Sequence, residues 1–219
     1  LLSILSLVAF ASMASAQQKI YVCEGFRYEV YDIKSTDDIV FSADGQEVSI
    51  GDYDTYELEE IDSITFAEPQ YPKVEIKYNG ASATVEVGHN VKGVTYSVKG
   101  ANVVLTSSTT TDEYLYTVSG KSDNGSLVIN GTYKLTVELA GLDLTNPNGP
   151  AIDIECGKRI GVVLKKGTVN NLADGKSGDH KGAFYTEGHP EFEGKGTLNV
   201  TGNTKHAICA KEYLQFKKS

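Results

Sequence analysis

The feature that most constrains this chain is a short sequence repeat of variable length, which recurs from residue 135 to the end. Its first copy consists of three apolar runs separated by turn residues, at 135–139, 142–145 and 149–154. Two further copies follow, and a fourth begins at Leu214. The third run of each copy is marked by an alanine: Ala151, Ala183 and Ala207. Successive copies are therefore 32 and 24 residues apart.

Each copy contains three short alternating strands, Gly/Asn turns and no helical periodicity. A unit of this size cannot bury its own apolar face, so it must stack on its neighbours. The sequence therefore predicts an all-β chain whose main part is a right-handed parallel β-helix, with coils about 4.8 Å apart. We expect Val137, Val163 and Phe192 to stack inward in successive coils.

The segment 74–130 carries further alternating strands, joined by Asn-Gly, Lys-Gly and Ser/Thr-rich turns. We interpret it as a cap and the first coils of the same solenoid, which then covers residues 73–219. An independent β-sandwich is the alternative for this segment.

The first 16 residues form an apolar stretch that ends in Ala14, Ser15 and Ala16. This pattern predicts a secretory signal peptide with its small-residue cleavage site before Gln17, and hence a protein that is secreted or at the cell surface, extracellular or periplasmic. A membrane anchor is the alternative, although the stretch is short for a bilayer, and no transmembrane segment is expected in the mature chain. Without an initiator Met, and with the copy at Leu214 incomplete, the sequence is expected to be truncated at both ends.

Residues 17–72 hold 14 acids and 3 bases, a balance of −11, whereas residues 73–219 hold 15 acids and 17 bases, a balance of +2. Within the acidic segment, residues 31–41 align without gaps on residues 56–66 at an offset of 25. Such a repeat predicts a small module of two β-hairpin-like elements, each ending in an Asp-x-Ile-x-Phe strand. Residues 61–66 resemble a phrase that opens many secreted proteins of Bacteroidetes-type bacteria. No basic patch with interleaved aromatic residues is present, which argues against a nucleic-acid partner.

Several strings resemble a secreted bacterial carbohydrate-binding family with a pectate-lyase-like β-helix. They are residues 116–131, 135–146, 149–154, 182–184 and 196–202. The resemblance extends over residues 73–219 and is sharpest after Tyr114. It implies an extracellular polysaccharide as the partner, acidic and similar to polygalacturonate, with calcium as the associated ion.

The resemblance also implies an acidic pair before the strand that follows each Ala-rich strand. Residues 187–190 and 211–213 contain one acid each at these places. We therefore place the candidate calcium site in the eight-residue expansion of the middle coil. There Asp174 and Asp179 lie five residues apart in a glycine-containing loop, and carboxylate oxygens are ligands that calcium prefers. A polar turn is the alternative.

Asp143 and Asp153 flank one corner of the first copy. Two carboxylates at one corner could act as an acid and a base, but in strands they are expected to point outward, on a sheet that faces the polysaccharide. We predict both as ligand-binding residues. The histidines of successive copies fit no zinc spacing and are expected on the surface; they are His180, His189 and His206.

Three classes of function compete. The first, which we predict, is a non-catalytic polysaccharide-binding protein, with calcium assisting if the ligand is anionic. The second is a structural or adhesive surface β-helix. The third is an enzyme: a lyase needs a cation beside the abstracted proton, yet Arg27 lies outside the solenoid and Arg159 has no carboxylate cluster near it in sequence. A hydrolase needs two or three clustered Asp residues on one face, and the repeats show no such cluster.

Overall fold

The computed structural model describes residues 18–34, 38–176 and 180–217, and within them every regular element is a β-strand. The predicted signal peptide lies outside these residues. The described part of the chain contains no long apolar helix of the kind that crosses a bilayer. The chain divides into two compact units, one ending at Gln70 and the other beginning at Tyr71.

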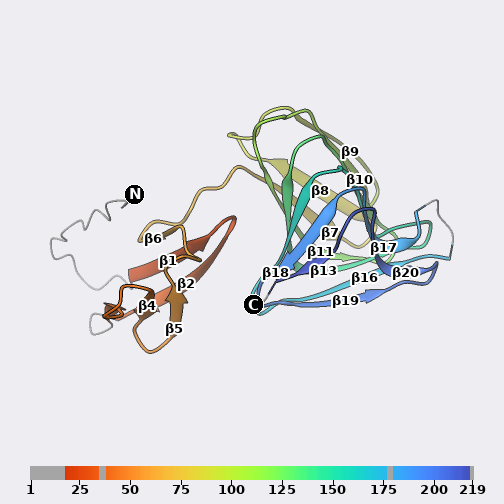
Figure 1. Ribbon diagram of the computed structural model, residues 1–219. Helices are drawn as coiled ribbons and strands as arrows, with labels where there is room; N and C mark the ends of the chain where they lie inside the picture. Colours follow the sequence, from red (N-terminus) through yellow and green to blue (C-terminus); the bar gives the residue numbers. More distant parts are fainter. Residues whose placement is uncertain (1–17, 35–37, 177–179, 218–219) are drawn as a thin grey trace. The chain divides into compact units, whose positions relative to one another are not determined.

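The N-terminal unit contains two antiparallel sheets of three strands (Figure 1). The first sheet is made of β2 (Arg27–Ile33), β1 (Gln18–Glu24) and β6 (Ser63–Thr65). The second is made of β3 (Ile39–Phe41), β4 (Glu47–Ile50) and β5 (Asp54–Glu57). The two copies of the 25-residue repeat end in β3 and β6, in different sheets. Their first residues, Tyr31 and Tyr56, are both buried and join through their hydroxyls, so the repeat builds a shared core.

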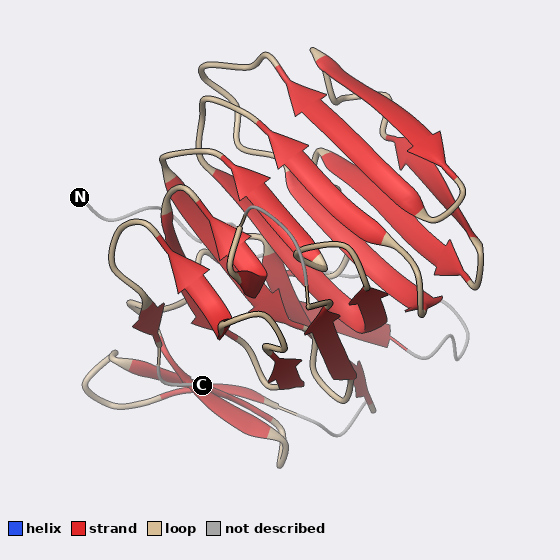
Figure 2. Ribbon diagram, turned by 90° about the vertical axis from the view of Figure 1, so that its right-hand side faces the viewer, coloured by secondary structure: helices blue, strands red, loops and turns tan. Residues whose placement is uncertain are grey.

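The C-terminal unit is a β-solenoid of about four turns, and this confirms the predicted fold class. Figure 2 shows its strands stacked side by side in sheets. The six-stranded sheet contains β20 (His206–Ala210), β17 (Gly182–Thr186), β14 (Ile152–Glu155), β12 (Ser126–Asn130), β10 (Asn102–Ser107) and β9 (Val94–Lys99). The nine-stranded sheet contains β21 (Gln215–Phe216), β18 (His189–Glu193), β15 (Arg159–Leu164), β13 (Leu135–Asn146), β11 (Leu115–Ser122), β7 (Lys73–Asn79), β8 (Ser82–Val87), β16 (Val169–Asp174) and β19 (Thr197–Thr201).

The marker alanines lie in register, as the repeat predicts. The amide of Ala151 donates to the carbonyl of Ala183 at 2.9 Å, and β14, β17 and β20 pair in parallel. Because each copy contributes one strand to this sheet, the sequence repeat and the structural coil are the same unit.

One column of the core runs through Val137, Val162 and Phe192, which pair in successive strands and are nearly or fully buried. The sequence predicted Val163 in place of Val162, and that prediction was wrong. Val163 is the register partner of Glu193, and its side chain lies on the outer side of the sheet. Side chains alternate along a strand, so an error of one residue exchanges the two faces. Each core side chain of this size contributes about 1.5 to 3 kcal/mol by its burial.

The first end of the solenoid departs from the predicted parallel pairing. Strands β7 and β8, and strands β9 and β10, pair antiparallel as two hairpins. The loops are Gly80-Ala81 and Gly100-Ala101, with glycine φ values of 64° and 62°. A glycine in the first position suits the tight turn of a two-residue hairpin. Since β7 and β10 also pair in parallel with β11 and β12, the segment is a cap joined to the coils and forms no independent sandwich.

A buried asparagine ties neighbouring coils together at a corner. Asn170 is fully buried, and its Oδ1 accepts the amides of Gly141 and Leu142, both at 2.9 Å. Its Nδ2 donates to the hydroxyl of Thr168 at 3.2 Å and to the carbonyl of Thr197 at 3.1 Å. Because all of these partners are satisfied inside the protein, the asparagine stabilises the corner instead of costing free energy.

Candidate functional site

The outer side of the six-stranded sheet carries a group of polar side chains. On β14, Ile152 and Ile154 are fully buried in the core, so the alternating residues Asp153 and Glu155 project outward. Tyr185 of the next coil is the register partner of Asp153 and projects on the same side. The stacking of coils thus brings residues from distant parts of the chain onto one surface.

His180 completes this group from the segment that precedes β17. Its Nδ1 lies 2.9 Å from Oδ2 of Asp153 and 3.5 Å from Oε1 of Glu155. Its ring stacks on Tyr185, with centroids 3.9 Å apart and planes at 17°. The tyrosine ring therefore helps to hold the imidazole over the two carboxylates.

Within this group, Asp153 has a polar atom that lacks a hydrogen-bond partner in the described part of the chain. Its side chain is 15% exposed, and among the described residues its Oδ1 atom is buried without a hydrogen-bond partner. Burial raises the pKa of Asp153. The pKa of Glu155 is also raised, mainly by burial and secondly by the nearby charge of Asp153. Two close carboxylates in a partly buried place favour a shared proton or a bound cation.

Two further residues extend the surface along the next coils. Glu187 follows β17 and accepts from the Tyr185 hydroxyl at 3.0 Å and from Lys211 Nζ at 2.5 Å. Lys211 and the tyrosine hydroxyl hold the pKa of Glu187 below its usual value. We call this surface the acidic face, and it consists of Asp153, Glu155, His180, Tyr185, Glu187 and Lys211.

The two aspartates predicted to bind ligand do not come together. Asp153 lies on the acidic face, whereas Asp143 lies on the nine-stranded sheet. There its carboxylate pairs with Lys121 at 2.9 Å, and its register partners are Lys121 and Asn171. An acid and base pair formed by Asp143 and Asp153 therefore has no support in the geometry. The placement of each on an outward side agrees with the sequence prediction.

The candidate calcium residue Asp174 is only 2% exposed. Its carboxylate accepts the backbone amides of Asn203 and Thr204, the latter at 3.2 Å, so each oxygen already holds the next coil. This arrangement fits a structural role and leaves little capacity for a calcium ion, which takes six or more oxygens. Asp179 lies outside the described residues, so the predicted metal pair stays a prediction and we derive no calcium chemistry from Asp174.

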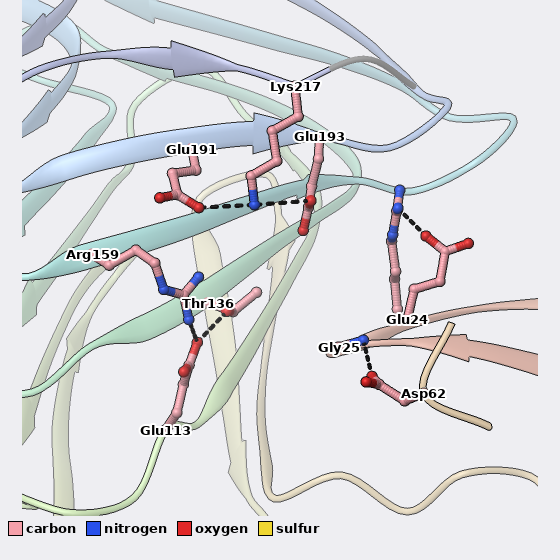
Figure 3. Close-up of polar contacts among 10 residues, drawn as sticks. Glu24, Gly25, Asp62, Glu113, Thr136, Arg159, Glu191, Glu193 and Lys217 are labelled. Atoms are coloured by element: carbon pink, nitrogen blue, oxygen red, sulfur yellow. Dashed lines mark hydrogen bonds and ion pairs between the residues drawn. The ribbon is translucent and has the colours of Figure 1, made fainter. Parts of the chain in front are cut away.

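The outer side of the nine-stranded sheet holds paired charges (Figure 3). Oε1 of Glu113 lies 2.5 Å from Arg159 and accepts from the Thr136 hydroxyl at 2.8 Å. Burial alone raises the pKa of Glu113, but Thr136 and then Arg159 hold it below its usual value. The sequence had placed Arg159 away from acids, and this partner corrects that interpretation. Lys217 likewise pairs with Glu191 at 2.9 Å.

The sequence did not identify Glu155, His180 or Tyr185 as members of a site. The signal for Glu155 was present, because Asp153 and Glu155 alternate with two isoleucines in a strand. His180 could not be placed, because its position depends on the length of the loop before β17. The sequence predicted no cluster of Asp residues on one face, and it did not anticipate the mixed pair of Asp153 and Glu155, which project side by side.

The architecture and this surface define a β-solenoid with an outward sheet of clustered polar and aromatic groups. The family of carbohydrate-binding domain-containing proteins matches residues 99–219, more than half of the chain, and the chain belongs to this family. No match was found among curated proteins.

Among solved structures, the fold is similar to that of the polysaccharide lyase-like protein from C. thermocellum, solved as a gadolinium derivative. The TM-score is 0.56 at 21% sequence identity, over 66% of this chain and 58% of that chain. At this identity the likeness shows the fold, and the match spans less than two thirds of that protein.

Proposed function

We propose that this chain is a non-catalytic, secreted or cell-surface protein that binds a polysaccharide on the acidic face. The observation that carries the proposal is the acidic face itself, in a chain that belongs to a carbohydrate-binding family. It places hydrogen-bonding groups and a tyrosine ring from neighbouring coils on one outward sheet. The secreted location follows from the predicted signal peptide.

The chemistry of the face suits a sugar chain. Carboxylates accept hydrogen bonds from hydroxyl groups, Lys211 donates them, and bonds that involve a charged partner are the stronger ones. Tyr185 is only 4% exposed, so it contributes by holding the His180 ring in place and not by contact of its own with the sugar. Strands of successive coils lie about 4.7 to 4.9 Å apart, so an extended ligand that crosses the coils meets a new set of side chains at each one.

Binding of an acidic polysaccharide to this face requires a cation between the carboxylates of the two partners. The face carries three carboxylates, those of Asp153, Glu155 and Glu187, against the ammonium group of Lys211 and an imidazole. Like charges repel at these distances, so a uronate chain needs a divalent cation between its carboxylates and the protein. We propose an acidic, polygalacturonate-like ligand, with calcium as the ion predicted from the sequence.

One observation favours a second candidate, cleavage of a glycosidic bond. The nearest ligand atoms of Asp153 and Glu155 lie within 4.8 Å of each other, and hydrolases that retain configuration use two carboxyl groups about 5 to 5.5 Å apart. The basic residues argue against the other route of cleavage, a lyase reaction: Lys211 and Arg159 are both held in ion pairs. Neither is therefore free to take a proton from a substrate.

A glycan array tests the proposal. The protein should bind acidic plant-type polysaccharides in calcium, lose binding when a calcium-selective chelator is added, and release no reducing ends or unsaturated products on long incubation. Absence of binding to every glycan contradicts the proposal. Binding to acidic glycans that the chelator leaves intact removes calcium from it, and release of sugar products replaces it with an enzymatic function.

A further inference from the structure

We propose that Asp153, Glu155 and His180 form a binding site for a borderline divalent transition-metal ion of the zinc class. This inference concerns an ion held by the protein alone, and its test needs no carbohydrate, although the three residues also belong to the acidic face. It is also distinct from the predicted calcium pair, which involves other residues.

The geometry already resembles that of ligands around one ion. The three side chains offer one donor atom each, and these atoms lie within 4.8 Å of one another. The imidazole nitrogen is 2.9 Å from Asp153 and 3.5 Å from Glu155. Ligand atoms that bind one zinc ion at about 2.0 to 2.2 Å have separations of this size.

A second observation points to a missing partner. Oδ1 of Asp153 is buried without a hydrogen-bond partner among the described residues. A buried carboxylate oxygen in this state costs free energy unless a proton or a cation satisfies it. The oxygen that faces His180 is Oδ2, so an ion beside His180 satisfies Oδ1 as well when the Asp153 carboxylate binds it through both oxygens.

The donor set selects the class of ion. Calcium takes six to eight oxygen ligands, whereas an imidazole nitrogen suits zinc, copper, iron and nickel. Two carboxylates and one imidazole supply three protein donors, the number found in zinc sites that keep a position open. Tyr185 stacks on the imidazole and limits its rotation, which favours a preformed site.

The chain supplies a matched control at a second histidine. Nδ1 of His189 lies 2.9 Å from Oε2 of Glu212, and its ring stacks on Tyr213 with centroids 4.5 Å apart. The surroundings resemble those of His180, but among the described residues no second carboxylate joins the group. If a histidine beside one acid and one tyrosine were sufficient, His189 would bind metal as well.

The test measures metal binding by the whole chain, with any affinity tag removed. Isothermal titration with zinc, and separately with calcium, is compared for wild type, His180→Gln, Glu155→Gln and His189→Gln. The visible spectrum of bound cobalt reports whether nitrogen and oxygen ligands surround the ion. Circular dichroism without metal checks that each variant is folded, and Glu155→Gln is the least disruptive because that side chain is 34% exposed.

We expect one zinc ion per chain, bound more tightly than calcium. Both His180→Gln and Glu155→Gln should weaken zinc binding at least about 10- to 100-fold, the loss that even an indirect supporting partner causes. His189→Gln should bind zinc as wild type does. Equal zinc affinity in wild type and His180→Gln, tighter binding of calcium than of zinc, or an equal loss in His189→Gln overturns the assignment.

Discussion

Two aspartates on strands of different sheets show how differently this solenoid uses the same side chain. Asp174, at the end of β16, is 2% exposed and accepts two backbone amides from the next coil. Asp153, on β14, is also largely buried, yet one of its oxygens faces His180 and the other has no hydrogen-bond partner among the described residues. Both oxygens of Asp174 are thus used by the fold, whereas one buried oxygen of Asp153 is left without a partner in the part of the chain that the structure describes.

The difference teaches where to look for function in a repetitive protein. Nearly all buried polar atoms in folded proteins have partners, and an exception calls for an explanation. Both carboxylates belong to repeats of the same kind, so sequence position alone does not distinguish them. Their hydrogen-bond partners do: those of Asp174 indicate a structural role, and those of Asp153 are the basis of the ligand-binding proposal.

The largest effect on stability is expected for substitution of Asp174. Asp174→Ala removes two hydrogen bonds that a buried carboxylate accepts from the backbone amides of Asn203 and Thr204. Hydrogen bonds to charged groups are worth about 1.5 to 3 kcal/mol each, so we expect about 3 kcal/mol less unfolding free energy. Urea unfolding measures this as a lower midpoint with an unchanged slope. Asp174→Asn, which keeps an acceptor, should recover part of the loss. A cost below about 1 kcal/mol for the alanine variant breaks the comparison.

An intermediate effect is expected at Glu113, whose carboxylate is satisfied by Thr136 and Arg159. Glu113→Gln should cost about 1 to 2 kcal/mol at neutral pH, since hydrogen bonds to charged groups are worth roughly 1.5 to 3 kcal/mol and Arg159 keeps part of its hydration.

The pKa of Glu113 is lowered in the folded state, so the stabilisation is present above the unfolded pKa, about 4.3, and is lost as the pH falls through the folded value. Unfolding measured from pH 7 to pH 3 should show the difference between the variants shrinking below about pH 4. A difference that grows on acidification contradicts the sign.

The smallest stability effect is expected on the acidic face. Asp153→Asn removes a charge that repels Glu155 and Glu187 and keeps an oxygen for His180, so the unfolding free energy should change by less than about 1 kcal/mol. Thermal unfolding in the absence of metal checks this. A loss as large as that of Asp174→Ala shows that Asp153 is structural as well.

The repeats allowed the fold to be predicted, because the spacing of Ala151, Ala183 and Ala207 sets the coil and alternation sets the strands. The choice between Val162 and Val163 could not be made, because both are apolar and a shift of one residue exchanges inside and outside. The antiparallel hairpins at the cap were also missed. Their Gly-Ala loops were visible in sequence, but the partner of an edge strand depends on tertiary structure.

The candidate site was predictable only in part. Asp153 was placed correctly on an outward side, and Glu155 follows from the same alternation. His180 reaches them across 27 residues of sequence, and its approach depends on a loop whose path no periodicity describes. The role of Asp174 could not be decided from the sequence, because a carboxylate in a glycine-containing loop has the composition of a metal site whether or not backbone amides occupy it.

The central claim is that the acidic face binds polysaccharide, and a comparison of Glu187→Gln with Glu191→Gln tests it most directly. Both glutamates lie on an outer face and pair with a lysine, Glu187 with Lys211 and Glu191 with Lys217, but only Glu187 belongs to the acidic face. Affinity for the polysaccharide identified on the array is measured by titration for both variants and wild type. We predict that Glu187→Gln binds about tenfold or more weakly, the equivalent of one charged hydrogen bond, and that Glu191→Gln binds as wild type does. Equal affinities for all three proteins, or a loss confined to Glu191→Gln, would place the binding surface elsewhere.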